Sequence, residues 1–247
     1  MRYLYLLVSC LLFAGCSKSD KQEGPIEPSK PSWTFMYLAG DSTCAPKSAS
    51  DRPKYGWGEK LRPYLGKCSV DNKAVGGKSS KTYISDGYWS KLTQCLKEGD
   101  VVLIQFGHND ESTNSSDDRG TTPEQYYNYL LKMIKEVKGK KAMPVVLTPI
   151  CRHQFSNGVP VYSHKTYPQK AKDVAAAESV VLLDIEQLTY EWLAELGEEE
   201  AKLRFMMSQP GSNDTTHLTE LGADEIAAIV AKALKESGNE KLAALVK

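Results

Sequence analysis

Four short polar motifs contain residue types that are able to carry out acyl transfer. Ser42, Gly77 and Asn109 each follow a separate apolar run, and Asp214 precedes His217 by three residues near the C-terminal end. A carboxylate that orients an imidazole, which in turn takes the proton of a serine hydroxyl, makes serine a nucleophile. A glycine N–H and an asparagine amide are donors suited to a developing oxyanion. Taken singly, each motif is weak evidence, because an Asp-Ser pair, a glycine pair and a polar segment after a strand are also found in turns or helix caps.

Strands that alternate with helices are the elements that must position these residues. The predicted strands are short apolar runs separated by amphipathic stretches: residues 34–39, 68–75, 101–106, 144–148 and 180–185. The predicted helices lie between and after them: residues 58–65, 88–96, 123–137, 168–178 and 219–236. This alternation is typical of a parallel sheet, and ligands bind such sheets at the carboxyl ends of the strands. The sequence therefore predicts an α/β fold, a single doubly wound, flavodoxin-like domain with a five-stranded parallel sheet between helices.

The N-terminal residues are typical of an export signal. Arg2 precedes an apolar run over residues 4–14, which is too short to span a membrane. The small residues Ala14 and Gly15 precede Cys16, and this arrangement resembles a bacterial lipobox, in which the cysteine is acylated. We predict a lipoprotein signal peptide over residues 1–15, lipidation of Cys16, and an outer-membrane lipoprotein that faces the periplasm or the cell surface. Ordinary secretory cleavage near Ala14 is the alternative, and it also exports the protein.

The residues after Cys16 separate this signal from the folded part of the chain. Residues 16–32 are polar and contain three prolines, as in an extended, flexible tether between a lipid and a domain. The folded domain is predicted over residues 33–247. We therefore expect the protein to contact the membrane through its lipid anchor on Cys16.

The charge balance and the cysteines limit the classes of partner. Lysine plus arginine equals aspartate plus glutamate, 31 each, so no basic stripe is present to neutralise a nucleic-acid backbone, and nucleic acid is excluded as a partner. The cysteines of the body have no zinc-like spacing, and no metal site is predicted. Export permits disulfides, and three full pairings remain open for these four residues: Cys44, Cys68, Cys95 and Cys151.

In this chain order the motifs resemble the SGNH hydrolase superfamily. Its serine, glycine, asparagine and histidine blocks match Ser42, Gly77, Asn109 and His217. Further segments resemble its rhamnogalacturonan acetylesterase branch: Gly56-Trp57-Gly58, Gly77-Lys78-Ser79-Ser80, residues 106–110, Thr148-Pro149-Ile150 and Tyr167-Pro168. That branch commonly has arginine at the position of Lys78, and often a second arginine at the position of His153, which follows Arg152 here. These departures leave the exact polysaccharide open.

The resemblance implies a serine carboxylic-ester hydrolase. It implies a carbohydrate O-acetylesterase that acts on a rhamnogalacturonan-like pectic polysaccharide or oligosaccharide through an acyl-enzyme, with Ser42 as nucleophile, His217 as base and Asp214 orienting the imidazole. The implied oxyanion hole comprises the backbone N–H groups of Ser42 and Gly77 and the amide of Asn109. The resemblance implies no metal and no organic cofactor. The alternatives are an esterase of other acetylated glycans or of lipid esters, and a non-catalytic glycan-binding lipoprotein.

Two other sets of side chains are candidates for contact with the substrate. The remaining histidines are expected to be structural or to face the substrate: His108, His153 and His164. Trp57, Trp89 and Tyr88 could stack on sugar rings. Trp57 lies in a Gly-Trp-Gly segment, and we expect it to pack beneath the site.

Overall fold

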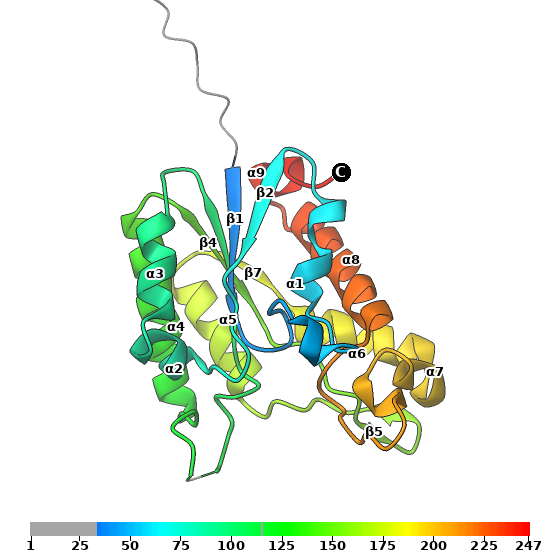
Figure 1. Cartoon of the computed structure of the whole chain (residues 1–247). Helices are drawn as coiled ribbons and strands as arrows, with labels where there is room; N and C mark the ends of the chain where they lie inside the picture. Colours follow the sequence, from blue (N-terminus) through cyan, green and yellow to red (C-terminus); the bar gives the residue numbers. More distant parts are fainter. Residues whose placement is uncertain (1–33, 115) are drawn as a thin grey trace, which may run out of the picture. The chain divides into compact units, whose positions relative to one another are not determined.

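A parallel sheet forms the centre of the computed structural model, which describes residues 34–114 and 116–247 (Figure 1). Its five strands run in the order β2-β1-β3-β4-β7. Their bounds are β1 Thr34–Gly40, β2 Cys68–Asn72, β3 Val101–Gln105, β4 Met143–Leu147 and β7 Val181–Leu183. The first described strand, β1, lies inside the sheet, with β2 on one side and β3, β4 and β7 on the other, which is the order of a doubly wound, flavodoxin-like fold. This confirms the predicted fold class.

Helices cover both faces of the sheet. One face carries α2 Ser80–Ser85, α3 Tyr88–Cys95, α4 Pro123–Gly139 and α5 Tyr167–Ala177. The other carries α1 Trp57–Lys60, α6 Ile185–Leu196, α7 Glu198–Lys202, α8 Glu220–Glu236 and α9 Glu240–Ala244. Short 3-10 helices and one small hairpin complete the connections: η1 Ala49–Asp51, η2 Arg62–Tyr64, η3 Met206–Ser208, β5 Phe155–Ser156 and β6 Val159–Pro160.

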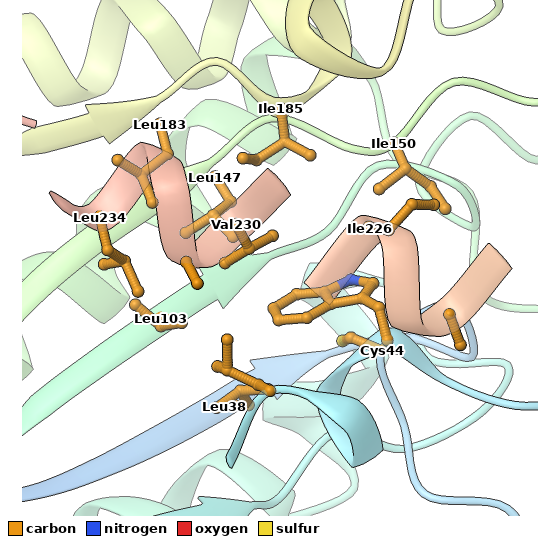
Figure 2. Packing of buried hydrophobic residues seen from close by; sticks show 14 of the residues in the cluster. Leu38, Cys44, Leu103, Leu147, Ile150, Leu183, Ile185, Ile226, Val230 and Leu234 are labelled. Carbon is orange, nitrogen blue, oxygen red and sulfur yellow. The ribbon is translucent and has the colours of Figure 1, made fainter. Parts of the chain in front are cut away.

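Successive strand residues point to opposite faces, and this alternation builds two cores. Leu38 and Leu103 belong to the core beneath α8, whereas Ala39 and Ile104 belong to the core on the other face. Figure 2 shows the first core, in which strand leucines meet Val230 and other apolar residues of α8. Each fully buried side chain of this size stabilises the fold by roughly 1.5–3 kcal/mol, so the sheet is a rigid support for the loops at its edge.

Most predicted elements agree with the structure to within two residues at each end, and three of the differences lie at β2, β7 and α1. The second strand ends at Asn72, although the N–H groups of Lys73 and Val75 still donate to carbonyls of β1 before the turn at residues 76–77. The last strand ends at Leu183, because Asp184 is the N-cap of α6 and its carboxylate accepts from the N–H of Gln187. The helix predicted over residues 58–65 is interrupted, since Pro63 has no N–H to continue the helical ladder, and a 3-10 turn follows α1.

Several elements were not predicted at all: α2, α6, α7, α9 and the β5–β6 hairpin. The final long helix agrees with the prediction, and Thr219 is its N-cap, because its hydroxyl accepts a hydrogen bond from the N–H of Gly222. Among the described residues, no helix has the length and apolar character needed to cross a membrane.

The N-terminal predictions lie outside the described residues. The signal peptide at 1–15, the acylated Cys16 and the tether at 16–32 therefore remain predictions. The four cysteines of the body are free: Cys44, Cys68 and Cys151 are buried, and Cys95 is exposed. None of the pairings that the sequence left open is present.

Candidate active site

A hydrogen-bonded chain joins Ser42, His217 and Asp214 at the carboxyl edge of the sheet. Nε2 of His217 lies 2.9 Å from Oγ of Ser42, and Nδ1 lies 2.8 Å from Oδ2 of Asp214. The other carboxylate oxygen of Asp214 accepts from the backbone N–H groups of Thr216 and His217, both at 3.0 Å. The imidazole is therefore held with one nitrogen on the carboxylate and the other on the hydroxyl, which is the geometry that serine activation requires.

The carboxylate of Asp214 is stabilised in its ionised form. Burial alone would raise the pKa of Asp214, but the hydrogen bonds and charge of His217 outweigh burial and hold this pKa below its ordinary value. The loop that carries both residues is anchored from η3, because the N–H groups of Met206 and Met207 donate to the carbonyls of His217 and Asp214 at 2.8 Å. An anchored, ionised carboxylate favours the imidazolium that forms when His217 accepts a proton.

Ser42 stands on a tight loop directly after β1. The N–H of Thr43 donates to the side chain of Asp41 at 2.9 Å, and the chain then turns so that Ala45 donates to the carbonyl of Asp41 at 3.0 Å. A Cβ at Gly40 would lie only 2.7 Å from the backbone oxygen of Gln105 in the neighbouring strand. Glycine at this position therefore lets the loop leave the sheet close to β3 and present the serine at its edge.

A buried hydrogen-bonded contact between Asp41 and His108 ties the loop that carries Ser42 to the loop after β3. Oδ2 of Asp41, which is fully buried, lies 3.2 Å from Nδ1 of His108. Burial would raise the pKa of Asp41, but the charge and hydrogen bond of His108, together with the bonds from Thr43, keep this pKa below its ordinary value. His108 therefore connects the residue before Ser42 with the residue before Asn109, a structural role consistent with the prediction for this histidine.

The glycine turn after β2 lies beside Ser42. A Cβ built on Gly76 would be 3.7 Å from the Cβ of Ser42, so this turn passes directly next to the serine. Gly77 has a backbone φ of +75°, a conformation that residues with a Cβ atom rarely adopt. Nδ2 of Asn109 donates to the carbonyl of Lys78 at 3.0 Å, which brings the asparagine amide to the same turn. The three predicted oxyanion donors thus gather at one edge of the sheet.

The amide of Asn109 is held at both ends. Its Oδ1 accepts a hydrogen bond from Nη1 of Arg119 at 3.0 Å, and Nη2 of this arginine pairs with Asp117 at 2.6 Å. Sequence reasoning did not identify Arg119, because it lies in the irregular segment between β3 and α4, where no periodicity indicates which side chains turn back toward the sheet.

Arg152 joins the loop that carries Asp214 and His217 to the loop after β3. Its Nε donates to Oγ1 of Thr216 at 3.1 Å, and its Nη1 lies 2.5 Å from Oε1 of Glu111 and 3.2 Å from Nδ1 of His164. Burial lowers the pKa of His164 to about 4, so this imidazole is neutral. Arg152 thereby fixes Thr216, the residue before His217, relative to the loop after β3 that carries Asn109. No pattern in the sequence around Arg152 indicated this role.

A polar hollow of about 440 Å³ opens next to Asn109. Its walls come from the loops after β3 and β4: His108, Asn109, Glu111, Ser112, Thr113, Arg119, Arg152, Gln154, Ser163 and Lys165. Hydroxyl, amide and charged groups dominate these walls, and such groups suit a ligand rich in hydroxyls more than a long acyl chain.

The tryptophans that could have stacked on sugars are buried. Trp57 is 1% exposed and donates from Nε1 to Gln105, and Trp89 is 2% exposed and donates to Glu136. The expectation that Trp57 packs beneath the site is confirmed. His153 is also buried, and its Nε2 lies 2.8 Å from the carbonyl of Glu198. Within residues 34–114 and 116–247, no group of three or more His, Cys, Asp or Glu side chains is arranged to hold a metal ion.

Comparison with known proteins identifies relatives along most of the chain. Residues 38–225 match the GDSL-like Lipase/Acylhydrolase family. A protein of Bacillus subtilis named "Probable rhamnogalacturonan acetylesterase YesY" is 38% identical over 205 residues, which cover 82% of this chain and 93% of the relative. The rhamnogalacturonan acetylesterase RhgT of the same organism is 32% identical over 82% of this chain and 90% of its own length.

Solved structures share the fold. The protein YxiM of Bacillus subtilis superposes with a TM-score of 0.75 at 27% identity, over 84% of this chain and 58% of that chain. A variant of the acetylxylan esterase Axe2 from Geobacillus stearothermophilus superposes with a TM-score of 0.60 at 17% identity, over 84% and 95% of the two chains. At this lower identity the likeness concerns the fold alone.

Proposed function

The chain belongs to the GDSL-like Lipase/Acylhydrolase family and is an ester hydrolase, and we propose that it removes acetyl groups from a pectic polysaccharide of the rhamnogalacturonan type. The observation that carries the proposal is the hydrogen-bonded chain from Ser42 through His217 to Asp214. The substrate class is supported by the names of two relatives that cover four fifths of the chain at 38% and 32% identity. The polar hollow beside Asn109 suits a carbohydrate.

In the proposed first step, Oγ of Ser42 forms a bond to the carbonyl carbon of the acetyl ester. The hydroxyl proton moves to Nε2 of His217, which lies 2.9 Å away, and the carbonyl electron pair moves onto its oxygen. Asp214 stabilises the resulting imidazolium. When the tetrahedral intermediate collapses, the sugar oxygen leaves with the proton from His217, and the acetyl group stays on Ser42.

The proposed oxyanion hole consists of the backbone N–H groups of Ser42 and Gly77 and Nδ2 of Asn109. Such preorganised donors stabilise the charge that develops in the transition state, and they act again when water attacks the acetyl-enzyme. In that second step His217 takes a proton from water and returns one to Oγ of Ser42, and acetate is released. Neither step requires a metal or an organic cofactor.

We further propose that the protein is exported and anchored to the outer membrane through acylated Cys16. The support is the short apolar run before Cys16 and the polar, proline-containing residues 16–32 after it. A tethered esterase would meet the polysaccharide outside the cytoplasm. Labelling with a radioactive or alkyne-bearing fatty acid, compared between the wild type and Cys16→Ala, tests this part of the proposal, because loss of label without loss of expression is expected.

Acetate release from a panel of acetylated polysaccharides tests the proposed activity. Wild type and Ser42→Ala are incubated with acetylated rhamnogalacturonan, acetylated xylan and a chromogenic acetate. We expect the wild type to release acetate fastest from rhamnogalacturonan, and the folded Ser42→Ala variant to be inactive on all three. Retained turnover in the variant would contradict the nucleophile, and a preference for xylan would contradict the substrate class.

A further inference from the structure

Tyr162 presents an aromatic ring at the surface of the carboxyl edge. It is 50% exposed, in contrast to the buried Trp57 and Trp89. Its ring stacks on that of Tyr190 with centroids 4.4 Å apart and planes at 9°, and its hydroxyl donates to Oε1 of Gln187 at 2.6 Å. One face of the ring is therefore covered and the hydroxyl is fixed, while the exposed half of the side chain is held in a defined orientation.

Tyr162 belongs to a small apolar surface on the segment that contains the β5–β6 hairpin. Val159 is 54% exposed and Val161 is 40% exposed. The segment is not loose, because the N–H of Val161 donates to the carbonyl of Gln154 at 2.9 Å. Three exposed apolar side chains within residues 159–162 of a well-anchored segment make this segment a candidate surface for contact with a ligand or a partner.

Along the chain, this surface lies next to residues that line the hollow beside Asn109. Ser163 and Gln154 line the hollow, and Ser163 follows Tyr162 directly, so their Cα atoms are about 3.8 Å apart. Arg152, which also holds Thr216 next to His217, donates to the carbonyl of Ser163 at 3.3 Å. Tyr162 is thus covalently next to Ser163, and hydrogen bonds connect Ser163 through Arg152 and Thr216 to the loop that carries Asp214.

We propose that Tyr162 is a binding platform for a pyranose ring of the polysaccharide chain, at a position next to the sugar whose acetyl group lies at Ser42. This inference rests on the proposed function and extends it to a second sugar subsite. A pyranose has a face of C–H groups that packs on an aromatic ring, and its hydroxyls meet the polar walls of the adjoining hollow. A tyrosine already stacked and hydrogen-bonded loses little conformational entropy when a ligand covers it.

Substrates of different size separate the contribution of Tyr162 to binding from that of the residues around Ser42. An acetylated polysaccharide reaches both Ser42 and Tyr162, whereas a chromogenic acetate reaches Ser42 alone. Aromatic stacking contributes about 0.5–1.5 kcal/mol, which corresponds to a factor of about 2 to 10. We expect Tyr162→Ala to raise KM for the polysaccharide by about this factor, and to lower the ratio of kcat/KM for the polysaccharide to kcat/KM for the chromogenic acetate. Tyr162→Phe, which keeps the ring, should keep most of that ratio.

Phe35→Ala is the matched control. Phe35 is 40% exposed and its ring stacks on Tyr37, but it lies at the start of β1, at the opposite edge of the sheet. This variant should leave the ratio unchanged. Calorimetric binding of the deacetylated polysaccharide to Ser42→Ala, with and without Tyr162→Ala, measures the same contact without turnover, and we expect weaker binding in the double variant.

Several outcomes would reject the platform. An unchanged ratio in Tyr162→Ala rejects it while leaving the proposed function intact. An equal loss on both substrates would show that Tyr162 supports the site in a general way. Failure of the wild type to release acetate from any polysaccharide, together with rapid hydrolysis of the chromogenic acetate, rejects both proposals. An unchanged ratio with lost self-association or lost binding to anionic vesicles would assign the surface to a second copy of the chain or to a membrane.

Discussion

Nη1 of Arg119 donates a hydrogen bond to Oδ1 of Asn109 over 3.0 Å. The amide carbonyl is thereby occupied by a cation, and the NH2 group must turn to the other side, where it donates to the carbonyl of Lys78. An asparagine amide has two N–H groups, and among the described residues this nitrogen has one acceptor. The orientation that Arg119 imposes therefore leaves one N–H of this amide for a substrate oxygen, as the proposed oxyanion hole requires.

Asn109→Ala should remove this donor and lower kcat by roughly 100- to 1000-fold, with a much smaller effect on KM. The reason is that the amide meets a full negative charge only in the transition state. Steady-state kinetics and a thermal melt on one preparation measure the effect. If Asn109 served only the turn, the melting temperature would fall and the folded fraction would turn over normally.

Arg119→Met should lower kcat by about 2- to 10-fold, because it removes one hydrogen bond, and that bond affects the reaction only by orienting the amide of Asn109. The arginine positions Asn109 and does not touch the ester in the proposed mechanism. The decisive comparison is the double variant: in the Asn109→Ala background, Arg119→Met should have no further effect on kcat. Additive losses would show that Arg119 acts on the substrate or on the fold and not through Asn109.

Asp214→Asn should lower kcat by as much as about 10⁴-fold while leaving the fold intact. An amide in this position can donate to Nδ1 of His217, and the imidazole would then present a proton to Ser42 in place of a lone pair. The pH dependence of kcat, measured from acid to alkaline conditions, reports the change. Wild-type kcat in a folded Asp214→Asn variant would mean that His217 needs no orienting carboxylate.

The site residues that were predicted from the sequence could be recognised for one physical reason. Ser42, Gly77 and Asn109 follow buried apolar strands, and parallel strands bring their carboxyl ends to a single edge. Asp214 precedes His217 by three positions, and both come directly before the last predicted helix. Local patterns thus placed each motif, and the sheet topology brought the motifs together.

The residues that were missed depend on long-range contacts from irregular segments. Arg119, Arg152 and Tyr162 lie in loops without periodicity, and their partners are set by how those loops fold back on the sheet. The helix α6 was missed for a related reason. The apolar run at 180–185 reads as one strand through Ile185, whereas the side chain of Asp184 interrupts it and starts a helix.

The polar hollow beside Asn109 predicts a preference for short acyl groups. Among the described residues, its walls carry hydroxyls, amides and charges, and burying a long alkyl chain against them would gain little hydrophobic free energy. We expect kcat/KM for a chromogenic acetate to exceed that for the octanoate with the same leaving group. Faster octanoate turnover would favour the lipid-ester alternative.

A buried carboxyl next to Asn109 should make the stability of the fold fall as pH rises. Asp110 is fully buried and accepts hydrogen bonds from the N–H of Ser80, yet burial raises its pKa to about 7. The folded state therefore binds a proton more tightly than the unfolded chain, in which the pKa of an aspartate is about 3.9. Between about pH 4 and pH 7 the folded state holds the extra proton, so the free energy of unfolding decreases as pH increases through this window.

Asp110→Asn removes the ionisation and keeps the shape of the side chain, so it should reduce this slope. One proton corresponds to about 1.4 kcal/mol per pH unit, and part of the slope should remain, because burial also raises the pKa of Glu186 to about 7. Denaturant unfolding of wild type and variant at several values between pH 4 and pH 8 measures the two slopes. Asp173→Asn, which alters an exposed carboxylate on α5, is the control and should leave the wild-type slope unchanged. Equal slopes in wild type and Asp110→Asn would mean that Asp110 is already ionised in the folded protein near pH 4, and that the hydrogen bonds from Ser80 offset its burial.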